Sequence, residues 1–262
     1  MPETFSHGEF VGLIPAGGQA ERISPLPCSK ELYPIGFRPV DKEQSRRPKV
    51  VSHYLLEKMK SAGINKVYFV LRPGKWDIPA YYGDGSMLDM CFAYLMLGVP
   101  YGVPFTLDQA YPFVRHATVA FGFPDILFEA DQGFTQLYTH HSSTAADISL
   151  GLFPATHFLS LEDRVILDET GTVKDILLRP MRSDLPFSWA IAVWGPSFTE
   201  FLHRYVGDKK IAGKQPVELS AGHAIQEAIR NGLRATGLIL GERPYIDIGT
   251  PDGLHLALTS VQ

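Results

Sequence analysis

The chain has 262 residues, of which 24 are Lys or Arg, 28 are Asp or Glu and 2 are Cys, and 45% of its residues are hydrophobic. This length suits one large α/β domain or two domains of about 150 residues each. It is also sufficient to bury a core without disulfides or metals. The formal net charge of −4 argues against a generally basic nucleic-acid-binding protein. We therefore expect no nucleic-acid partner.

The sequence also limits the expected location of the protein. It contains no run of about 18 apolar residues, so no membrane span or membrane partner is expected. The first 18 residues have neither a basic start nor a long apolar stretch, and they do not resemble a secretory signal. Cys28 and Cys91 form no CxxC pair and no Cys/His cluster, which argues against a disulfide scaffold or a zinc site. A reducing cytoplasm is the expected location.

The first elements alternate between strand and helix. Residues 10–14 form an apolar run that is closed by Pro-Ala-Gly-Gly, which predicts a buried strand entering a loop. Residues 50–62 place apolar side chains at helical spacing and end before a glycine. Residues 66–71 are rich in strand formers. The order strand, helix, strand predicts a βαβ unit and a parallel sheet.

The same alternation continues along the chain, with one hairpin in the second half. The segments 164–167 and 173–178 flank a turn of sequence DETGT, which predicts an antiparallel hairpin. The stretch 36–48 is polar and contains prolines; it is interpreted as a surface loop, or as a basic loop that holds a charged substrate. Further strands are predicted at 90–95, 117–121, 147–153 and 189–194, a short segment at 245–249, and helices at 105–114, 134–141, 197–206, 217–231 and 251–261.

These elements predict one α/β domain over residues 1–262. Its sheet is expected to be doubly wound and mostly parallel, with helices on both faces. A small antiparallel lobe is expected from about residues 155–190. In such a fold, ligands bind outside the carboxyl ends of the strands.

The loop after the first strand carries the clearest chemical signal. It has the sequence LIPAGGQAERISPLPCSKELYPI, residues 13–35. Backbone N–H groups at Gly17 and Gly18 can approach phosphate oxygens closely, and Arg22 and Lys30 would add charged contacts. The loop has neither G-x-G-x-x-G nor G-K-[ST], so it is not a generic dinucleotide or Walker A loop. Composition alone leaves phosphate binding and an ordinary turn with ordinary loop charges both open.

This loop resembles the signature of the sugar-1-phosphate nucleotidylyltransferases, the family of glucose-1-phosphate thymidylyl- and uridylyltransferases and other NDP-sugar pyrophosphorylases. In that family a strand is followed by A-G-G-x-G-T-R and then by P-K-x-L-x-P. The resemblance extends over about residues 10–260 and implies a Rossmann-like nucleotidyltransferase fold. Six further segments resemble family segments in the same order, namely KVVSHYLLEKMKSAGINKVYFVL, IPAYYGDGS, YGVPFTLDQA, PDILF, GTVKDILLRP and YIDIGTPDGLHLA.

The resemblance implies an enzyme that transfers a nucleotidyl group. An oxygen of the sugar-1-phosphate attacks the α-phosphorus of a nucleoside triphosphate, and pyrophosphate leaves. Arg22 and Lys30 match the catalytic cations of the signature. Asp125 and Asp247 match the two aspartates that hold Mg²⁺, the implied cofactor. Arg179 occupies the place of the lysine in E-K-P, which contacts the sugar phosphate.

The resemblance also implies the substrates and the residues around the nucleotide. The partners would be dTTP, UTP or CTP and a sugar-1-phosphate, and such proteins often assemble as homo-oligomers. The residues implied to surround the nucleotide are Leu13, Ala16, Gly17, Gly18 and Gly102.

Several positions depart from the family pattern. Ala20 replaces the third glycine, and Glu21 replaces the threonine beside the triphosphate. Leu97 and Leu178 stand where base and sugar recognition would otherwise use polar side chains, and Pro124 replaces a glycine. These departures leave open a cytidylyltransferase acting on a polyol or amino-alcohol phosphate. They also leave open an inactive relative that only binds nucleotide or nucleotide-sugar.

Each charged candidate has a structural alternative as well. Asp125 could cap the turn that follows its strand, and Asp247 could cap the last helix. Arg179 could pair at the surface with Asp184 or Glu162.

Overall fold

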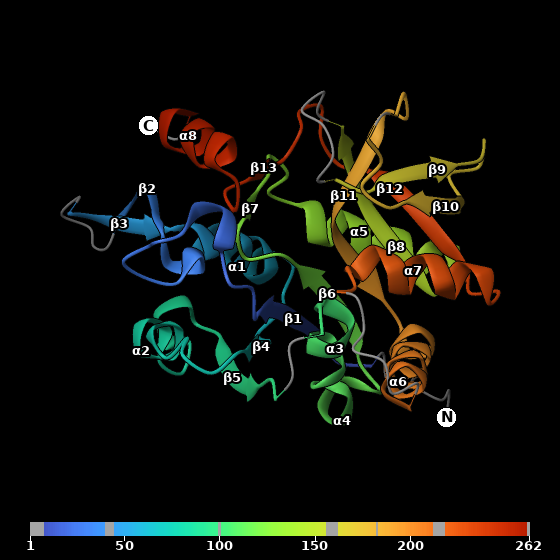
Figure 1. Cartoon of the computed structure of the whole chain (residues 1–262), viewed down its shortest axis with the longest axis horizontal. Helices are drawn as coiled ribbons and strands as arrows, with labels where there is room; N and C mark the ends of the chain where they lie inside the picture. The colour runs from blue at the N-terminus through green and yellow to red at the C-terminus, as the bar shows by residue number, and fades with distance from the viewer. Residues whose placement is uncertain are drawn as a thin grey trace, which may run out of the picture.

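The fold is organised around a seven-stranded sheet with strand order β5-β4-β1-β6-β11-β8-β12 (Figure 1). The computed structural model describes residues 8–39, 45–98, 101–155, 162–181, 183–211 and 218–260. The strands of the sheet are β1 (Phe10–Ala16), β4 (Lys66–Leu71), β5 (Cys91–Met96), β6 (Thr118–Gly122), β8 (Ile148–Pro154), β11 (Phe187–Trp194) and β12 (Ala235–Ile239).

The sheet is mostly parallel, as predicted. β1 pairs in parallel with β4 and β6, β4 with β5, and β8 with β12. β11 is the exception, because it runs antiparallel to both of its neighbours, β6 and β8. The carboxyl ends of the other six strands therefore meet at one edge of the sheet, together with the start of β11.

Helices cover both faces, which confirms the doubly wound arrangement. Leu13 and Ile14 are consecutive in β1, yet they belong to different cores on opposite faces. This two-sided burial explains why β1 is a continuous apolar run. α1 and α5 pack on one face, and α3, α6 and α7 on the other (Figure 1). The helices are α1 (Val51–Ser61), α2 (Asp77–Tyr82), α3 (Val103–Asp108), α4 (Tyr111–Val114), α5 (Gly133–Thr144), α6 (Pro196–Ile211), α7 (Ala221–Arg230) and α8 (Pro251–Ser260).

Three small antiparallel sheets flank the main one. The predicted hairpin is confirmed as β9 (Arg164–Leu167) paired with β10 (Val173–Leu177). Residues 187–190, expected at the end of the small lobe, belong instead to β11 of the main sheet. β7 (Ile126–Leu127) pairs with β13 (Ile246–Asp247), which joins the segment after β6 to the C-terminal part of the chain.

The interpretation of residues 36–48 as a loop is wrong for residues 36–39 and 46–48, which are strands. β2 (Pro34–Pro39) and β3 (Arg46–Val50) form an antiparallel pair, and residues 40–44 lie outside the described residues. Prolines and charges obscured these strands in the sequence. Proline is compatible with a strand mainly at an edge of the sheet, where the N–H that it lacks is not needed for pairing.

Several other helices and strands differ from the sequence predictions. The helix predicted at 105–114 is divided into α3 and α4, which are separated by Gln109 and Ala110. α7 begins later than predicted, because Ser220 and His223 form a capping box at its start. α2 and β12 are not predicted. No helix in the described parts of the chain has the length and apolar character needed to cross a membrane.

Candidate active site

A cavity of about 570 Å³ opens at the edge where the carboxyl ends of the strands meet. This volume is typical of small-molecule sites, and the position is the one expected for a doubly wound sheet. The lining comes from the loop after β1, the segment after β6, the segment after β10, the start of α7 and the segment around β13.

The loop after β1 places Gly17, Gly18 and Arg22 along the cavity, together with Glu21. Ala20 adopts a left-handed backbone conformation, with φ 57° and ψ 28°. This conformation costs an L-residue about 1–2 kcal/mol and is the reason that glycine is usual at such positions. The loop thus keeps a glycine-type turn although the sequence has alanine there.

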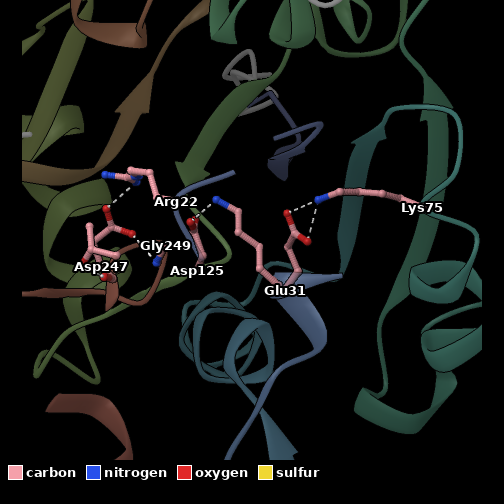
Figure 2. Close-up of polar contacts among 8 residues, drawn as sticks. Arg22, Glu31, Lys75, Asp125, Asp247 and Gly249 are labelled. Carbon is pink, nitrogen blue, oxygen red and sulfur yellow. Dashed lines mark hydrogen bonds and ion pairs between the residues drawn. The ribbon is translucent and has the colours of Figure 1, made fainter. Parts of the chain in front are cut away.

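Four of the five charged residues singled out in the sequence form two ion pairs in this cavity. Arg22 Nη2 lies 3.2 Å from Asp247 Oδ2, and the Lys30 ammonium donates to Asp125 Oδ2. Figure 2 shows Asp125 and Asp247 approaching the same region from two segments. The Ile248 N–H donates to the Asp125 carbonyl at 3.1 Å, so the chain keeps the two aspartates adjacent.

Burial and neighbouring charges set the protonation of these groups. Burial opposes the charge on Lys30, but the Asp125 and Glu31 carboxylates outweigh it and raise the pKa of Lys30. Burial likewise opposes the charge on Asp125, yet the Lys30 ammonium holds the pKa of Asp125 below its usual range. Burial, together with the nearby Asp125 carboxylate, raises the pKa of Asp247. Asp247 is therefore the first of the two aspartates to take up a proton as the pH falls.

Asp247 does not cap α8 with its side chain; Thr250 does, because its hydroxyl accepts the Gly253 N–H at 3.0 Å. One oxygen of the Asp247 carboxylate accepts the Gly249 N–H at 2.8 Å, and the other faces Arg22. The Asp247 carbonyl accepts the Thr250 hydroxyl at 3.0 Å, just before α8 begins. The last turn before α8 therefore orients the carboxylate toward the cavity.

Arg179 lines the cavity at its other end, near the start of α7. Its φ is 43°, and its backbone N–H donates to Asp163 Oδ1 at 3.3 Å. Of the two surface partners considered for Arg179, Glu162 forms an ion pair with Arg164 at 2.6 Å. Burial raises the pKa of Asp163, although Arg179 opposes this shift.

Gly102 also lines the cavity, and its backbone explains why it is glycine. Its φ is 103°, and a Cβ there would lie 2.2 Å from the Leu219 carbonyl oxygen. We expect Gly102→Ala to lower the free energy of unfolding by about 2–4 kcal/mol, from backbone strain and overpacking. Urea denaturation checks this, with Gly207→Ala as control, because a Cβ at Gly207 meets nothing within 4 Å. Equal stability of the two variants would contradict the close approach.

Two of the residues implied to surround the nucleotide do not line the cavity. Leu13 is 1% exposed and Ala16 is fully buried, and their side chains lie in the two cores. Leu97 does line the cavity, and a Cβ on Gly17 would lie 3.6 Å from Leu97 Cδ2.

The sequence analysis missed several charged residues of the site. Glu31 lines the cavity and pairs with Lys75, which comes from the loop after β4. Asp163, which lies beside Arg179, and Glu218 also line the cavity. Glu31 could have been noticed because it follows Lys30, but its partner lies 44 positions away and no local pattern connects the two.

The lining is more acidic than basic. Among the described residues it includes the cations Arg22, Lys30 and Arg179 and seven carboxylates, namely Glu21, Glu31, Asp125, Glu162, Asp163, Glu218 and Asp247. No group of three or more His, Cys, Asp or Glu side chains that could enclose a metal by itself occurs in the described ranges. Because carboxylates outnumber cations in the lining, a bound polyphosphate would need additional positive charge.

Comparison with solved structures identifies the fold, whereas comparison of the sequence identifies no relative. No protein-family profile matches the sequence, and a search of curated proteins returns no relative. A Bacillus anthracis protein described as a glucose-1-phosphate thymidylyltransferase, crystallised with sucrose, superposes with a TM-score of 0.79 at 16% identity, over 96% of this chain and 94% of that one. The chain has the fold of the sugar-1-phosphate nucleotidylyltransferases. A UDP-glucose pyrophosphorylase in complex with UDP-glucose superposes with a TM-score of 0.71 at 15% identity, over 97% of this chain and 98% of that one. This nucleotidylyltransferase fold extends over nearly the whole chain.

Proposed function

We propose that the protein transfers a nucleotidyl group from a nucleoside triphosphate to a sugar-1-phosphate, with Mg²⁺, and releases pyrophosphate. The observation that carries this proposal is the pairing of Arg22 with Asp247 and of Lys30 with Asp125 in one cavity, at the carboxyl ends of the strands. The fold shared with two proteins described as nucleotidylyltransferases supports the same reaction class.

The cations have distinct places in this proposal. Lys30 lies deep in the site, with a side chain 15% exposed, and suits the α-phosphate, where charge develops during the transfer. Arg22 is more open, with a side chain 45% exposed, and suits the leaving pyrophosphate. Arg179 lies toward the other end of the cavity and would hold the phosphate of the acceptor. The acceptor oxygen and the α-phosphorus would then meet between the two ends.

Asp125 and Asp247 fit a Mg²⁺ ion. Carboxylate oxygens from one or two residues, completed by substrate phosphates and water, are the usual protein ligands of this ion. The acidic lining fits the same conclusion, because a polyphosphate and seven carboxylates would repel each other without a divalent cation. When bound, the ion would stabilise negative charge on the phosphates.

Pyrophosphate release tests the proposal. We expect release when the protein and Mg²⁺ are mixed with one of dTTP, UTP or CTP and one member of a panel of sugar-1-phosphates. Release should require both substrates, and a double variant, Arg22→Ala with Lys30→Ala, should be inactive. Nucleotide binding without release from any pairing would contradict the proposal and favour a nucleotide-binding relative.

A second acceptor class is favoured by one specific feature. Asp163 lies beside Arg179 and Trp189, and Glu218 and Tyr245 line the same cavity. Carboxylates and aromatic rings are suited to a cationic ammonium group. An amino-alcohol phosphate with CTP therefore belongs in the same panel. Release with this pairing alone would identify a cytidylyltransferase.

A further inference from the structure

Glu31, in the turn that carries Lys30, forms an ion pair with Lys75, and both charged residues are buried. Glu31 is 1% exposed and Lys75 is 9% exposed. The Lys75 ammonium donates to both carboxylate oxygens of Glu31, at 2.6 and 2.7 Å. An apolar pair of similar volume is often at least as stable as a buried ion pair. Stability alone therefore does not account for this pair.

Lys75 in the loop after β4 and Asp77 at the start of α2 bind the two chain neighbours of Lys30. Lys75 holds Glu31, and Asp77 accepts the Ser29 N–H at 2.6 Å and the Ser29 hydroxyl at 2.7 Å. Ser29 and Glu31 flank Lys30 directly in the sequence. The position of the Lys30 turn is therefore fixed by a segment more than 40 residues away, and this segment carries no proposed contact with substrate.

The Lys75–Glu31 ion pair also determines which carboxylate the Lys30 ammonium contacts. The charged groups that face Glu31 are Lys75 from the loop, Lys30 from its own turn and Asp125 from the segment after β6. Figure 2 shows the Glu31 carboxylate directed at Lys75, while Asp125 lies on the other side, toward Arg22. Without Lys75, the ionised Glu31 carboxylate would attract the Lys30 ammonium away from Asp125.

We propose that Lys75 is a positioning residue for Lys30: by engaging both oxygens of Glu31, it leaves the Lys30 ammonium on the cavity side, where it can meet a substrate phosphate. This inference rests on the proposed function and adds a residue from outside the cavity to its machinery. Glu31 would otherwise compete with Asp125 for the Lys30 ammonium, and its ion pair with Lys75 prevents this competition.

Two single variants that break the same ion pair test this inference. We expect Lys75→Met to lower kcat about tenfold to a hundredfold with little change in KM, because Lys30 is displaced from the reacting phosphate. We expect Glu31→Gln to lower kcat clearly less than Lys75→Met does, because it breaks the same ion pair but also removes the competitor. The double variant, Lys75→Met with Glu31→Gln, should have the kcat of Glu31→Gln alone. This comparison can be made even if Lys75→Met alone folds poorly.

The matched control is Lys58→Met. Lys58 is also 9% exposed and forms an ion pair with Asp131 at 2.5 Å, but it lies on α1 and does not line the cavity. It should lose stability without losing kcat. A role limited to stability predicts instead equal effects of Lys75→Met and Glu31→Gln on kcat, and that result would overturn the inference.

The pH profile gives a further readout. The defect of Lys75→Met should deepen as the pH rises, because a buried carboxyl without its partner ionises only at higher pH and then competes for Lys30. The double variant should lack this trend. A defect of Lys75→Met that does not change with pH would contradict the competition.

A measurement without substrate separates this inference from the proposed function. In NMR spectra of the lysine ammonium groups, the Lys30 signal, assigned with Lys30→Arg, should shift in Lys75→Met and return in the double variant. An unshifted signal in folded Lys75→Met overturns the positioning role, whether or not the wild type is active. An inactive wild type with the expected shift would contradict only the proposed function.

Discussion

Replacing Lys30 with alanine is expected to lower turnover by about 10²–10³-fold, because the negative charge that develops at the α-phosphate loses its buried cationic partner. Steady-state kinetics with the active substrate pair measure this directly. The loss should appear mainly in kcat, since the interaction strengthens in the transition state. A change confined to KM would instead give Lys30 a role in ground-state binding.

Two controls separate this effect from a loss of fold. Lys58→Ala removes a similarly buried lysine whose partner, Asp131, lies away from the cavity, and it should keep wild-type turnover. Lys30→Arg keeps the positive charge opposite Asp125 and should retain more activity than Lys30→Ala. Thermal unfolding of each variant shows whether the buried Asp125 tolerates the loss of its partner.

Replacing Asp125 or Asp247 with asparagine is expected to lower turnover by about 10²-fold at a fixed Mg²⁺ concentration. The neutral amide weakens the hold on a divalent cation, whose contribution to transition-state stabilisation is several kcal/mol. Raising the Mg²⁺ concentration should recover part of the activity. Isothermal titration of Mg²⁺ into the nucleotide complex should show weaker binding.

The matched control is Asp131→Asn, which neutralises a carboxylate that is paired with Lys58 outside the cavity. Its turnover and Mg²⁺ dependence should equal those of the wild type. Wild-type activity in both Asp125→Asn and Asp247→Asn would remove these residues from the metal site.

The acid limit of the reaction should follow Asp247. Its pKa is raised by burial and by the neighbouring Asp125, whereas the Lys30 ammonium keeps the pKa of Asp125 low. As the pH falls, Asp247 is protonated first, and its loss as an anionic ligand should lower kcat. In Asp247→Asn this acid limb should move to lower pH or disappear. An unchanged limb would assign it to another group.

The sequence predicted the parts of the fold whose patterns are local. β1 and β4 were found because each is an apolar run, and the β9–β10 hairpin because its turn sequence is distinctive. The sequence predicts a loop instead of the β2–β3 pair, because prolines and lysines are uncommon in strands. α2 was not predicted, since a helix of six residues that contains Pro79 has hardly any periodicity to detect.

The candidate site shows the same division. Arg22, Lys30, Asp125 and Asp247 were identified from a resemblance carried by short motifs, and the structure brings them into one cavity. Lys75 could not be identified in this way, because its pairing with Glu31 depends on how the loop after β4 packs against the signature turn. Contacts between distant segments leave no periodicity, and only the folded chain shows them.

Mass spectrometry of the reaction products tests the central claim most directly. The protein would be incubated with Mg²⁺ and the substrate pair selected by pyrophosphate release, with Lys30→Ala in parallel. We predict a product whose mass equals the nucleoside monophosphate plus the acceptor phosphate minus one water, formed by the wild type and nearly absent for Lys30→Ala. Free nucleoside monophosphate as the sole product, or equal product from both proteins, would contradict nucleotidyl transfer at this site.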